Sequence, residues 1–223
     1  MNSQIIVTAL FLIGFVAIIA LTEYLHKRFS LNSEFTRKIA HVLASLSSLV
    51  FIFVFDSFWY VLFIGFIFFF VLFIGKYKNA FRSIDSVRRK TGGSYLLPVS
   101  ICILFYFSNK LDNTLIFVLP ILILGISDPL AATFGMAFHN KTRKITILDY
   151  TFDKTILGSM VFFLSTFFIS WLTLSFFNYA MKEALMLSLV IAILNTFIEL
   201  ISSKGIDNIS VPLLTMMLLL LVR

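Results

Sequence analysis

Cysteine and charged residues are scarce in this chain of 223 residues, and each scarcity excludes a class of protein. The single cysteine, Cys102, rules out an internal disulfide, a cysteine-based zinc site and an iron–sulfur cluster. Charged residues make up 13% of the chain, about half of the roughly 25% that is typical of soluble domains. A chain with so few charges is not a water-soluble enzyme, and it is too apolar to be a disordered segment.

Apolar residues are abundant instead. They make up 60% of the sequence, and phenylalanine alone occupies 28 positions. A soluble globule of this size could not bury so much apolar surface, because the buried share of a small protein is limited by its surface-to-volume ratio. The composition therefore predicts an all-α, polytopic integral membrane protein, a bundle of about seven or eight transmembrane helices that forms one domain over residues 1–223.

Eight apolar runs are candidate membrane spans, since a bilayer core takes about 20 residues of helix. They are Ile5–Leu25, Ile39–Phe55, Phe58–Gly75, Ser94–Phe107, Leu115–Phe138, Thr155–Phe177, Ala184–Ile201 and Ile209–Val222. The fifth run is interrupted by Gly125, Asp128 and Pro129. Interrupted spans are tolerated where they line a cavity, so we expect the fifth span to contain the working centre.

Lysine and arginine fall on alternate loops of this arrangement. Fifteen of the 18 lie in loops on one side, and the other side keeps only Lys110, Lys182 and Arg223. The positive-inside rule places the fifteen in the cytosol and both chain termini on the extracytoplasmic side. Membrane topology then explains the net charge of +7, and no basic stretch is interleaved with aromatic residues in the way that indicates nucleic-acid binding.

Two carboxylates lie where a membrane span disfavours them. Asp128 is inside the fifth span, and Glu199 is near the predicted cytosolic end of the seventh. A carboxylate at the centre of a spanning helix costs about 3 kcal/mol on insertion scales, so it is usually retained for a function. Asp128 is therefore a candidate functional residue. Glu199 could equally reach the interface, and a structural pair with lysine is the alternative for both.

Basic groups lie at the start of the second span. Arg37 and His41 are one helical turn apart on the same face, with Lys38 beside them. Two cations and an imidazole at a helix start suit a phosphate-bearing ligand. Arg37 and Lys38 by themselves would be ordinary flanking charges, but His41 lies one step inside the apolar run.

The sixth span begins with a second group of polar residues. Lys154 precedes it, and Thr155 is suited to cap the helix, whose N-terminus favours anions. Gly158 would let a ligand or a neighbouring helix approach closely, and Ser159 follows it.

Oxygen donors lie between the last two spans. Asp207 and Asn208 carry oxygen atoms of the kind that Mg²⁺ binds, although Gly-X-Asp-Asn also forms a plain turn. All these groups fall at predicted cytosolic helix ends, and Asp128 is half a span away. Their convergence fits Mg²⁺–polyphosphate chemistry. The chain has no P-loop and no kinase glycine-rich loop, so a nucleotide site would be of an unrelated, membrane-embedded kind.

The order of these motifs resembles the dolichol kinase/phytol kinase family, which includes the CTP-dependent diacylglycerol kinases. The motifs are Arg37-Lys38-x-x-His41, Ser127-Asp128-Pro129-x-Ala131-Ala132-x-x-Gly135, Lys154-Thr155-x-x-Gly158-Ser159, Glu199 and Asp207-Asn208-x-x-x-Pro212. The resemblance covers about residues 37–223. Leu157 stands where many relatives have glutamate, so no role of that glutamate is carried over.

The resemblance implies an integral membrane enzyme with its active site on the cytosolic face. Such an enzyme transfers the γ-phosphoryl group of CTP, or of another nucleoside triphosphate, to an isoprenoid alcohol such as phytol or a polyprenol, or to diacylglycerol. It uses Mg²⁺ or another divalent cation. The implied catalytic residues are Asp128, Lys154 and His41, and the implied metal ligands are Asp128, Asp207 and Glu199. The implied nucleotide-binding residues are Arg37, Lys38, Lys154, Thr155, Gly158, Ser159 and Asn208.

Two other functions stay open at the level of sequence. A cytidylyltransferase of the phosphatidate type would use the same site to transfer CMP to a lipid phosphate, but its longer C-terminal signature is missing from this chain. A small ion-coupled transporter or flippase would use Asp128, Glu199 and the interrupted helix. The sequence also leaves homodimerisation open.

Overall fold

The computed structural model describes residues 2–78, 80–85, 92–138, 144–147 and 150–222. The first half of the chain forms α1 (Asn2–Phe29), α2 (Ser33–Ser48), α3 (Phe51–Val54), α4 (Phe58–Tyr77), α5 (Arg82–Asp85) and α6 (Gly93–Lys110). The second half forms α7 (Leu115–Leu122), the π turn η1 (Ile123–Ser127), α8 (Asp128–Ala137), β1 (Lys144–Ile147), β2 (Tyr150–Thr155), α9 (Ile156–Phe176), α10 (Met181–Ile201) and α11 (Asp207–Leu221).

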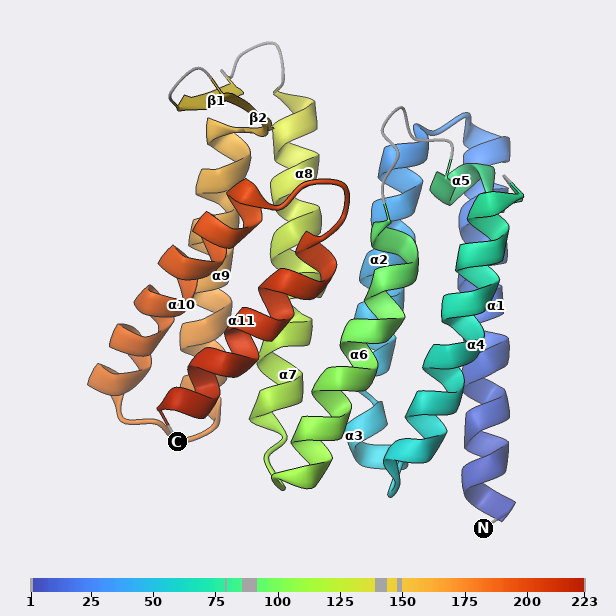
Figure 1. Ribbon diagram of the computed structural model, residues 1–223, viewed down its shortest axis with the longest axis horizontal. Coiled ribbons are helices and arrows are strands. Elements are labelled where there is room, and N and C mark those ends of the chain that lie inside the picture. The colour runs from blue at the N-terminus through green and yellow to red at the C-terminus, as the bar shows by residue number, and fades with distance from the viewer. Residues whose placement is uncertain (1, 79, 86–91, 139–143, 148–149, 223) are drawn as a thin grey trace.

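These elements form an upright helical bundle in which both chain termini lie at the same end (Figure 1). If α2–α3 and α7–η1–α8 are each taken as one pass, the described residues make eight passes, and each corresponds to one predicted span. Six passes are long and apolar enough to cross a membrane. The other two are α6, with 18 residues, and α11, a shorter apolar helix of 15 residues. The prediction of a polytopic helical membrane protein is confirmed.

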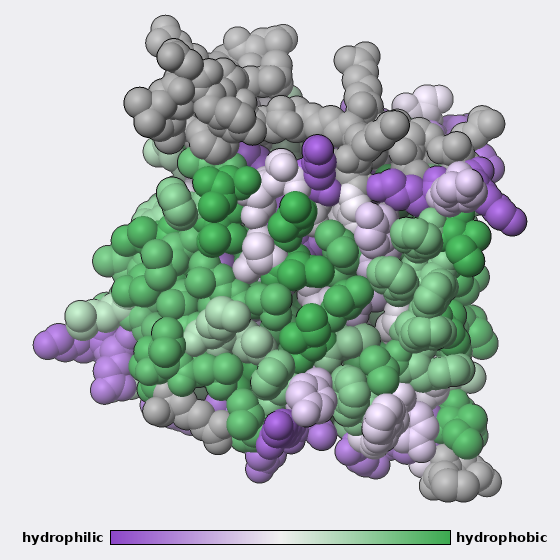
Figure 2. All heavy atoms as spheres, in the orientation of Figure 1, coloured by the Kyte–Doolittle hydropathy of each residue, from purple (hydrophilic) through white to green (hydrophobic). Residues whose placement is uncertain are grey.

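The outer surface agrees with this assignment. Figure 2 shows apolar side chains over the middle of the visible face, with hydrophilic side chains gathered toward its upper and lower margins. Large apolar residues such as Leu10, Phe66 and Phe168 are exposed on α1, α4 and α9. Such apolar faces are stable in the hydrocarbon of a lipid bilayer. A helix tolerates that environment because its backbone N–H and C=O groups are hydrogen-bonded within the same segment.

Two local features depart from plain α-helix. The predicted interruption of the fifth span is a π turn at Ile123–Ser127, and the helix continues through it into α8. Between α8 and α9 the strands β1 and β2 pair as an antiparallel hairpin, with Lys144 opposite Thr155. The hairpin lies at the end of the bundle away from the termini (Figure 1), so the bundle itself is all-α as predicted.

The core is divided into two clusters of different composition. The first lies among α1, α3, α4, α6 and α7 and is rich in phenylalanine, with Phe51, Phe68, Phe105 and Phe117 all buried. The second lies among α7, α9, α10 and α11 and is mainly aliphatic, with Phe162 as its only buried aromatic residue among those described. The two clusters meet at η1, which contributes Leu124 to the first cluster and Ile123 to the second.

Candidate functional site

The π turn places a free carbonyl beside α2. In a π turn each carbonyl pairs with the N–H group five residues on, and for Leu124 that residue is Pro129, which has no N–H. His41 on α2 fills the gap: its Nε2 lies 3.0 Å from the Leu124 carbonyl oxygen. Because a carbonyl only accepts hydrogen bonds, Nε2 carries the proton and donates. The hydrogen bond to the Leu124 carbonyl thus fixes the tautomer of a buried histidine.

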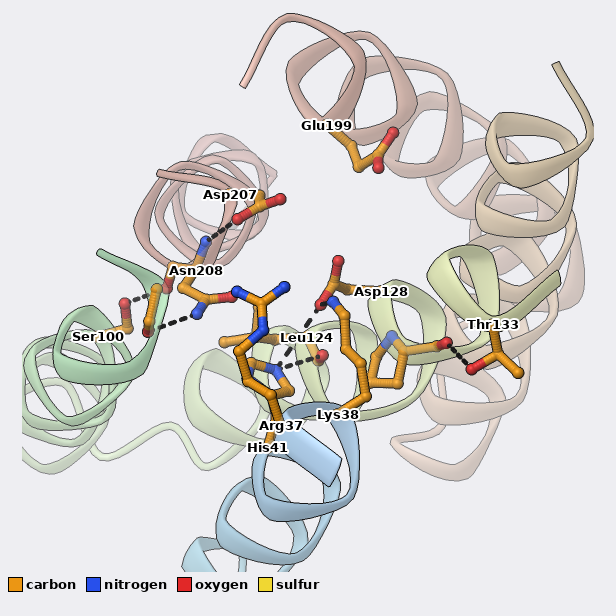
Figure 3. Close-up of polar contacts among 12 residues, drawn as sticks. Arg37, Lys38, His41, Ser100, Leu124, Asp128, Thr133, Glu199, Asp207 and Asn208 are labelled. Atoms are coloured by element: carbon orange, nitrogen blue, oxygen red, sulfur yellow. Dashed lines mark hydrogen bonds and ion pairs between the residues drawn. The ribbon is translucent and has the colours of Figure 1, made fainter. Parts of the chain in front are cut away.

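Asp128 follows directly and is buried at the start of α8. The Nζ of Lys38 donates to its Oδ2 at 2.5 Å, and Nε2 of His41 lies 4.0 Å from the same oxygen. A buried carboxylate needs such a partner, since an unpaired charge in an apolar interior is very costly. α2 therefore supplies Lys38 and His41, and α8 supplies the carboxylate of Asp128 (Figure 3). The π turn supplies the backbone carbonyl that His41 contacts.

A second charged group is centred on Lys154, the penultimate residue of β2. Its Nζ donates to Oε1 of Glu199 on α10 at 2.5 Å and to Oδ2 of Asp207 on α11 at 3.2 Å. Burial alone would lower the pKa of Lys154, but these two carboxylates outweigh it and raise the pKa above its usual value. Lys154 is therefore a permanent cation, and it ties β2, α10 and α11 together.

One oxygen of this group has no protein partner. Oε2 of Glu199 is buried and makes no hydrogen bond, although its other oxygen holds Lys154. Figure 3 shows Glu199, Asp207, Asp128 and Arg37 facing one common space. A buried carboxylate oxygen without a partner is expensive, so its position favours a ligand that approaches from that space.

The start of α9 is built for close packing. The Thr155 hydroxyl accepts a hydrogen bond from the backbone N–H of Gly158 at 3.1 Å, which caps the helix as predicted. A Cβ atom on Gly158 would lie 3.1 Å from the carbonyl oxygen of Ala131, so this glycine brings α9 against α8. The Ser159 hydroxyl is buried without a hydrogen-bond partner. Of the two roles considered for Gly158, the structure gives it the helix contact.

A second close approach joins α6 to the loop before α11. Gly205 has a φ of +87°, and a Cβ atom there would lie 2.3 Å from the backbone nitrogen of Gly93. The side-chain amide of Asn208 donates to the carbonyl oxygen of Gly93 at 2.6 Å, and the Ser100 hydroxyl donates to the carbonyl oxygen of Asn208. Asn208 therefore clamps α11 to α6. Its amide N–H is used structurally, which sequence spacing alone did not reveal.

All eleven residues singled out from the sequence line one cavity of about 610 Å³. They are Arg37, Lys38, His41, Asp128, Lys154, Thr155, Gly158, Ser159, Glu199, Asp207 and Asn208. Arg37 lies 3.5 Å from Glu34, which also lines the cavity. Five passes and a strand, far apart in sequence, thus contribute to one polar end.

The other end of the same cavity is apolar. It is lined by residues of α1, α2, α3, α4 and α6, among them Phe15, Phe51, Val61, Phe68 and Ile101. The contribution of α1 was missed by the sequence analysis. No signal in α1 could have revealed it, because a helix that faces lipid on one side and an apolar cavity on the other has no polar stripe.

The carboxylates of the cavity could bind a divalent cation in one of two ways: as a site made only of protein ligands, or together with substrate phosphates. Within the described residues, no group of three or more His, Cys, Asp or Glu side chains is placed to hold a metal ion. Mg²⁺ is usually bound by one or two carboxylates together with substrate phosphates, and not by a cage made only of protein. Asp128, Glu199 and Asp207, with the unpartnered Oε2 of Glu199, fit this second arrangement.

The chain matches no protein-family model, no curated protein and no solved structure. The likeness to the dolichol kinase/phytol kinase family therefore stays a prediction from short motifs. The geometry adds an independent observation: residues from those motifs, spread from position 37 to position 208, line the polar end of one cavity, where cations and carboxylates lie together.

Proposed function

We propose that this protein is a membrane-embedded lipid-alcohol kinase, which transfers the γ-phosphoryl group of CTP or another nucleoside triphosphate to the hydroxyl of a lipid. One observation carries the proposal. A single cavity joins Arg37, Lys38 and Lys154 at its polar end to an apolar end enclosed by helices of the membrane region. A lipid with a phosphate-accepting head matches both ends, whereas a soluble substrate would match only one.

The polar end supplies the charge that phosphoryl transfer needs. Arg37 faces the space shared by Asp128, Glu199 and Asp207 (Figure 3), and Lys154, which pairs with Glu199 and Asp207, lines the same cavity. A triphosphate there would therefore meet more than one cation. Lys38 pairs with Asp128 and also lines the cavity, so its ammonium can turn to a phosphate oxygen there. Catalysis of this kind consists mainly of positioning and neutralisation of charge.

The transfer step forms one bond to phosphorus and breaks another. The hydroxyl oxygen of the lipid forms a bond to the γ-phosphorus, and the bond from that phosphorus to the β–γ bridging oxygen breaks. The nucleoside diphosphate leaves with the bridging oxygen. Asp128 accepts the hydroxyl proton. His41, which is fixed by the Leu124 carbonyl, lies 4.0 Å from the same carboxylate.

A divalent cation fits this site alongside the triphosphate. Asp128, Asp207 and Glu199 are the residues that would hold it. Such a cation would neutralise charge on the β- and γ-phosphate oxygens when bound.

The active site belongs on the cytosolic side in this proposal. The polar end of the cavity lies at the end of the bundle opposite the two termini, where α1 ends and α2 and α6 begin. The span assignment from the sequence gives fifteen of the 18 lysine and arginine residues to that side. The positive-inside rule makes that end cytosolic, where nucleoside triphosphates are available.

A two-label experiment tests the proposed reaction. Purified protein in detergent is given Mg²⁺ and CTP labelled at either the α- or the γ-phosphate, together with isoprenols, diacylglycerol or phosphatidate. Label from the γ-phosphate in the lipid phase is the expected result. Label from the α-phosphate would instead mean CMP transfer, and would contradict the proposal. No transfer from CTP, ATP or UTP by folded protein would contradict it as well and would leave a transporter to be tested.

A further inference from the structure

The apolar end of the cavity has a defined shape, which we call the tail lobe. On α4 it is lined by Val61, Ile64, Gly65, Phe68 and Leu72, which lie on one face of the helix. From Leu72 to Val61 this lining extends over about three turns, or roughly 16 Å along the helix. The lobe thus runs lengthwise between the helices, from the polar end toward the end that carries the termini (Figure 1).

Aromatic rings close the tail lobe on the side of α1. Phe15 of α1 contacts Phe51 and Phe68 edge to face, with ring centroids 6.3 Å and 5.1 Å apart. Phe51 and Val61, which also line the cavity, are almost wholly buried. Below this layer Phe11 packs against Phe51 at 4.8 Å, and it does not line the cavity.

The size of the cavity limits what it can hold. The cavity of about 610 Å³ is shared between the polar end and the tail lobe. The tail lobe extends roughly 16 Å along α4, which matches one tail of moderate length. Two long acyl chains would have to share this one lobe, so its shape favours a single tail.

We propose that the tail lobe binds the single apolar tail of the acceptor alcohol and that Phe15 sets the maximum tail length. This inference rests on the proposed function for the identity of the acceptor, but the lobe and its closure are separate observations. α1 lies outside the part of the chain that carries the sequence resemblance, which begins near Arg37. Tail selection would therefore depend on a helix that the motifs do not include.

The test compares tail-length preference among three matched proteins. Phe15→Ala removes the ring that closes the lobe, and Phe11→Ala removes a ring one turn away that packs on the same Phe51 without lining the cavity. For each protein, kcat/KM is measured with geraniol, farnesol and geranylgeraniol. Phe15→Ala should shift the ratio of kcat/KM for the longest over the shortest alcohol by on the order of tenfold toward the longest, and Phe11→Ala should leave the ratio unchanged.

A variant of opposite effect guards against a merely structural explanation. Ala44 lines the cavity from α2, and Ala44→Leu should reduce kcat/KM for the longest alcohol while sparing the shortest. Equal profiles for wild type, Phe15→Ala and Ala44→Leu would overturn the inference. So would an equal shift in Phe15→Ala and Phe11→Ala, since general loosening of the core would then explain both.

Binding without nucleotide separates this inference from the proposed reaction. Equilibrium binding of the same tritiated alcohols is measured on purified protein in detergent. If no phosphate is ever transferred but Phe15→Ala shifts the binding preference toward longer tails, the tail lobe stands and the kinase fails. If phosphate is transferred while binding and turnover ignore all three substitutions, the kinase stands and the tail lobe fails.

Discussion

The two parts of the bundle solve the packing problem differently. The part built from α1 to α6 is filled by phenylalanine rings that meet edge to face, such as Phe51 with Phe55 and Phe105 with Phe117. The part built from α9 and α10 buries small polar residues, such as Ser170 and Ser188, along the facing helices. Large rings leave irregular space between helices, whereas small residues let backbones approach closely. The apolar end of the cavity accordingly lies in the first part, whereas the second part lines only its polar end.

The two parts also divide the chemistry between them. Lys38 and His41 come from the phenylalanine-rich part, and Glu199 and Asp207 come from the other part. Asp128 lies between them at the π turn. At this boundary both parts of the bundle contribute charged side chains to the site, but only the phenylalanine-rich part contributes the apolar lining of the tail lobe. Substitutions at the boundary should therefore have larger effects than substitutions within the closely packed part.

Asp128→Asn should abolish most turnover. The amide keeps the shape of the carboxylate but cannot accept the hydroxyl proton, and it leaves the Lys38 ammonium without its counter-charge. We expect a loss on the order of 10²–10⁴-fold in kcat, measured as transfer of γ-label to an isoprenol. Asp56→Asn is the control, because Asp56 lies between α3 and α4, away from the cavity. An Asp128→Asn protein with undiminished kcat would remove Asp128 from the mechanism.

Lys154→Met should lower stability as well as activity. Without the ammonium, Glu199 and Asp207 face each other with no cation between them. Removing one member of a buried ion pair typically costs 3–5 kcal/mol, and the partial exposure of Lys154 reduces this to about 2–3 kcal/mol. Unfolding in mixed micelles measures the change.

A compensating variant separates the two roles of Lys154. The double variant Lys154→Met with Glu199→Gln removes one carboxylate charge along with the cation, so it should recover most of the lost stability. It should not recover turnover. Recovery of both would show that Lys154 is only a structural tie.

Gly205→Ala should disturb the junction between α6 and α11. The φ of +87° disfavours any residue with a Cβ atom, and that atom would lie 2.3 Å from the backbone nitrogen of Gly93. We expect a loss of about 1–3 kcal/mol of stability. Gly14→Ala is the matched control, since a Cβ atom at Gly14 meets nothing within 4 Å, and it should be neutral in the same thermal unfolding measurement.

Ser188→Ala tests the closely packed part and should have the smallest effect. The Ser188 hydroxyl is buried without a hydrogen-bond partner, so alanine removes an unsatisfied group at almost the same volume. The free energy of unfolding should change by less than about 0.5 kcal/mol. Ser170→Ala on the facing helix should behave in the same way. A loss above about 1 kcal/mol for either variant would mean that these hydroxyls bond across the α9–α10 contact.

Much of this arrangement could be predicted from hydropathy and charge. Each predicted span corresponds to a helical pass, and the common end for both termini follows from an even number of passes. The polar residues could be selected because Asp128 and Glu199 are costly inside a membrane, and both proved to be buried beside lysine. At the level of sequence, a structural pair with lysine is the alternative to a functional role. Both carboxylates form such a pair, and both also line the cavity.

The remaining features depend on three-dimensional contacts that leave no sequence pattern. Pro129 indicated an irregular helix, but not that it would free the Leu124 carbonyl for His41. The Gly93–Gly205 contact joins residues more than a hundred positions apart. Phe15 lines the cavity from a helix that is apolar on every side, so periodicity could not separate its cavity face from its lipid face.

The most direct test of the account is a competition between two acceptors in one reaction. Reconstituted protein receives γ-labelled CTP, Mg²⁺ and an equimolar mixture of geranylgeraniol and a long-chain diacylglycerol, and the labelled lipids are separated. A kinase site at the polar end joined to a single-tail lobe predicts that the label appears mainly in the prenyl monophosphate. Label found mainly in phosphatidate, or in neither lipid, would contradict the account.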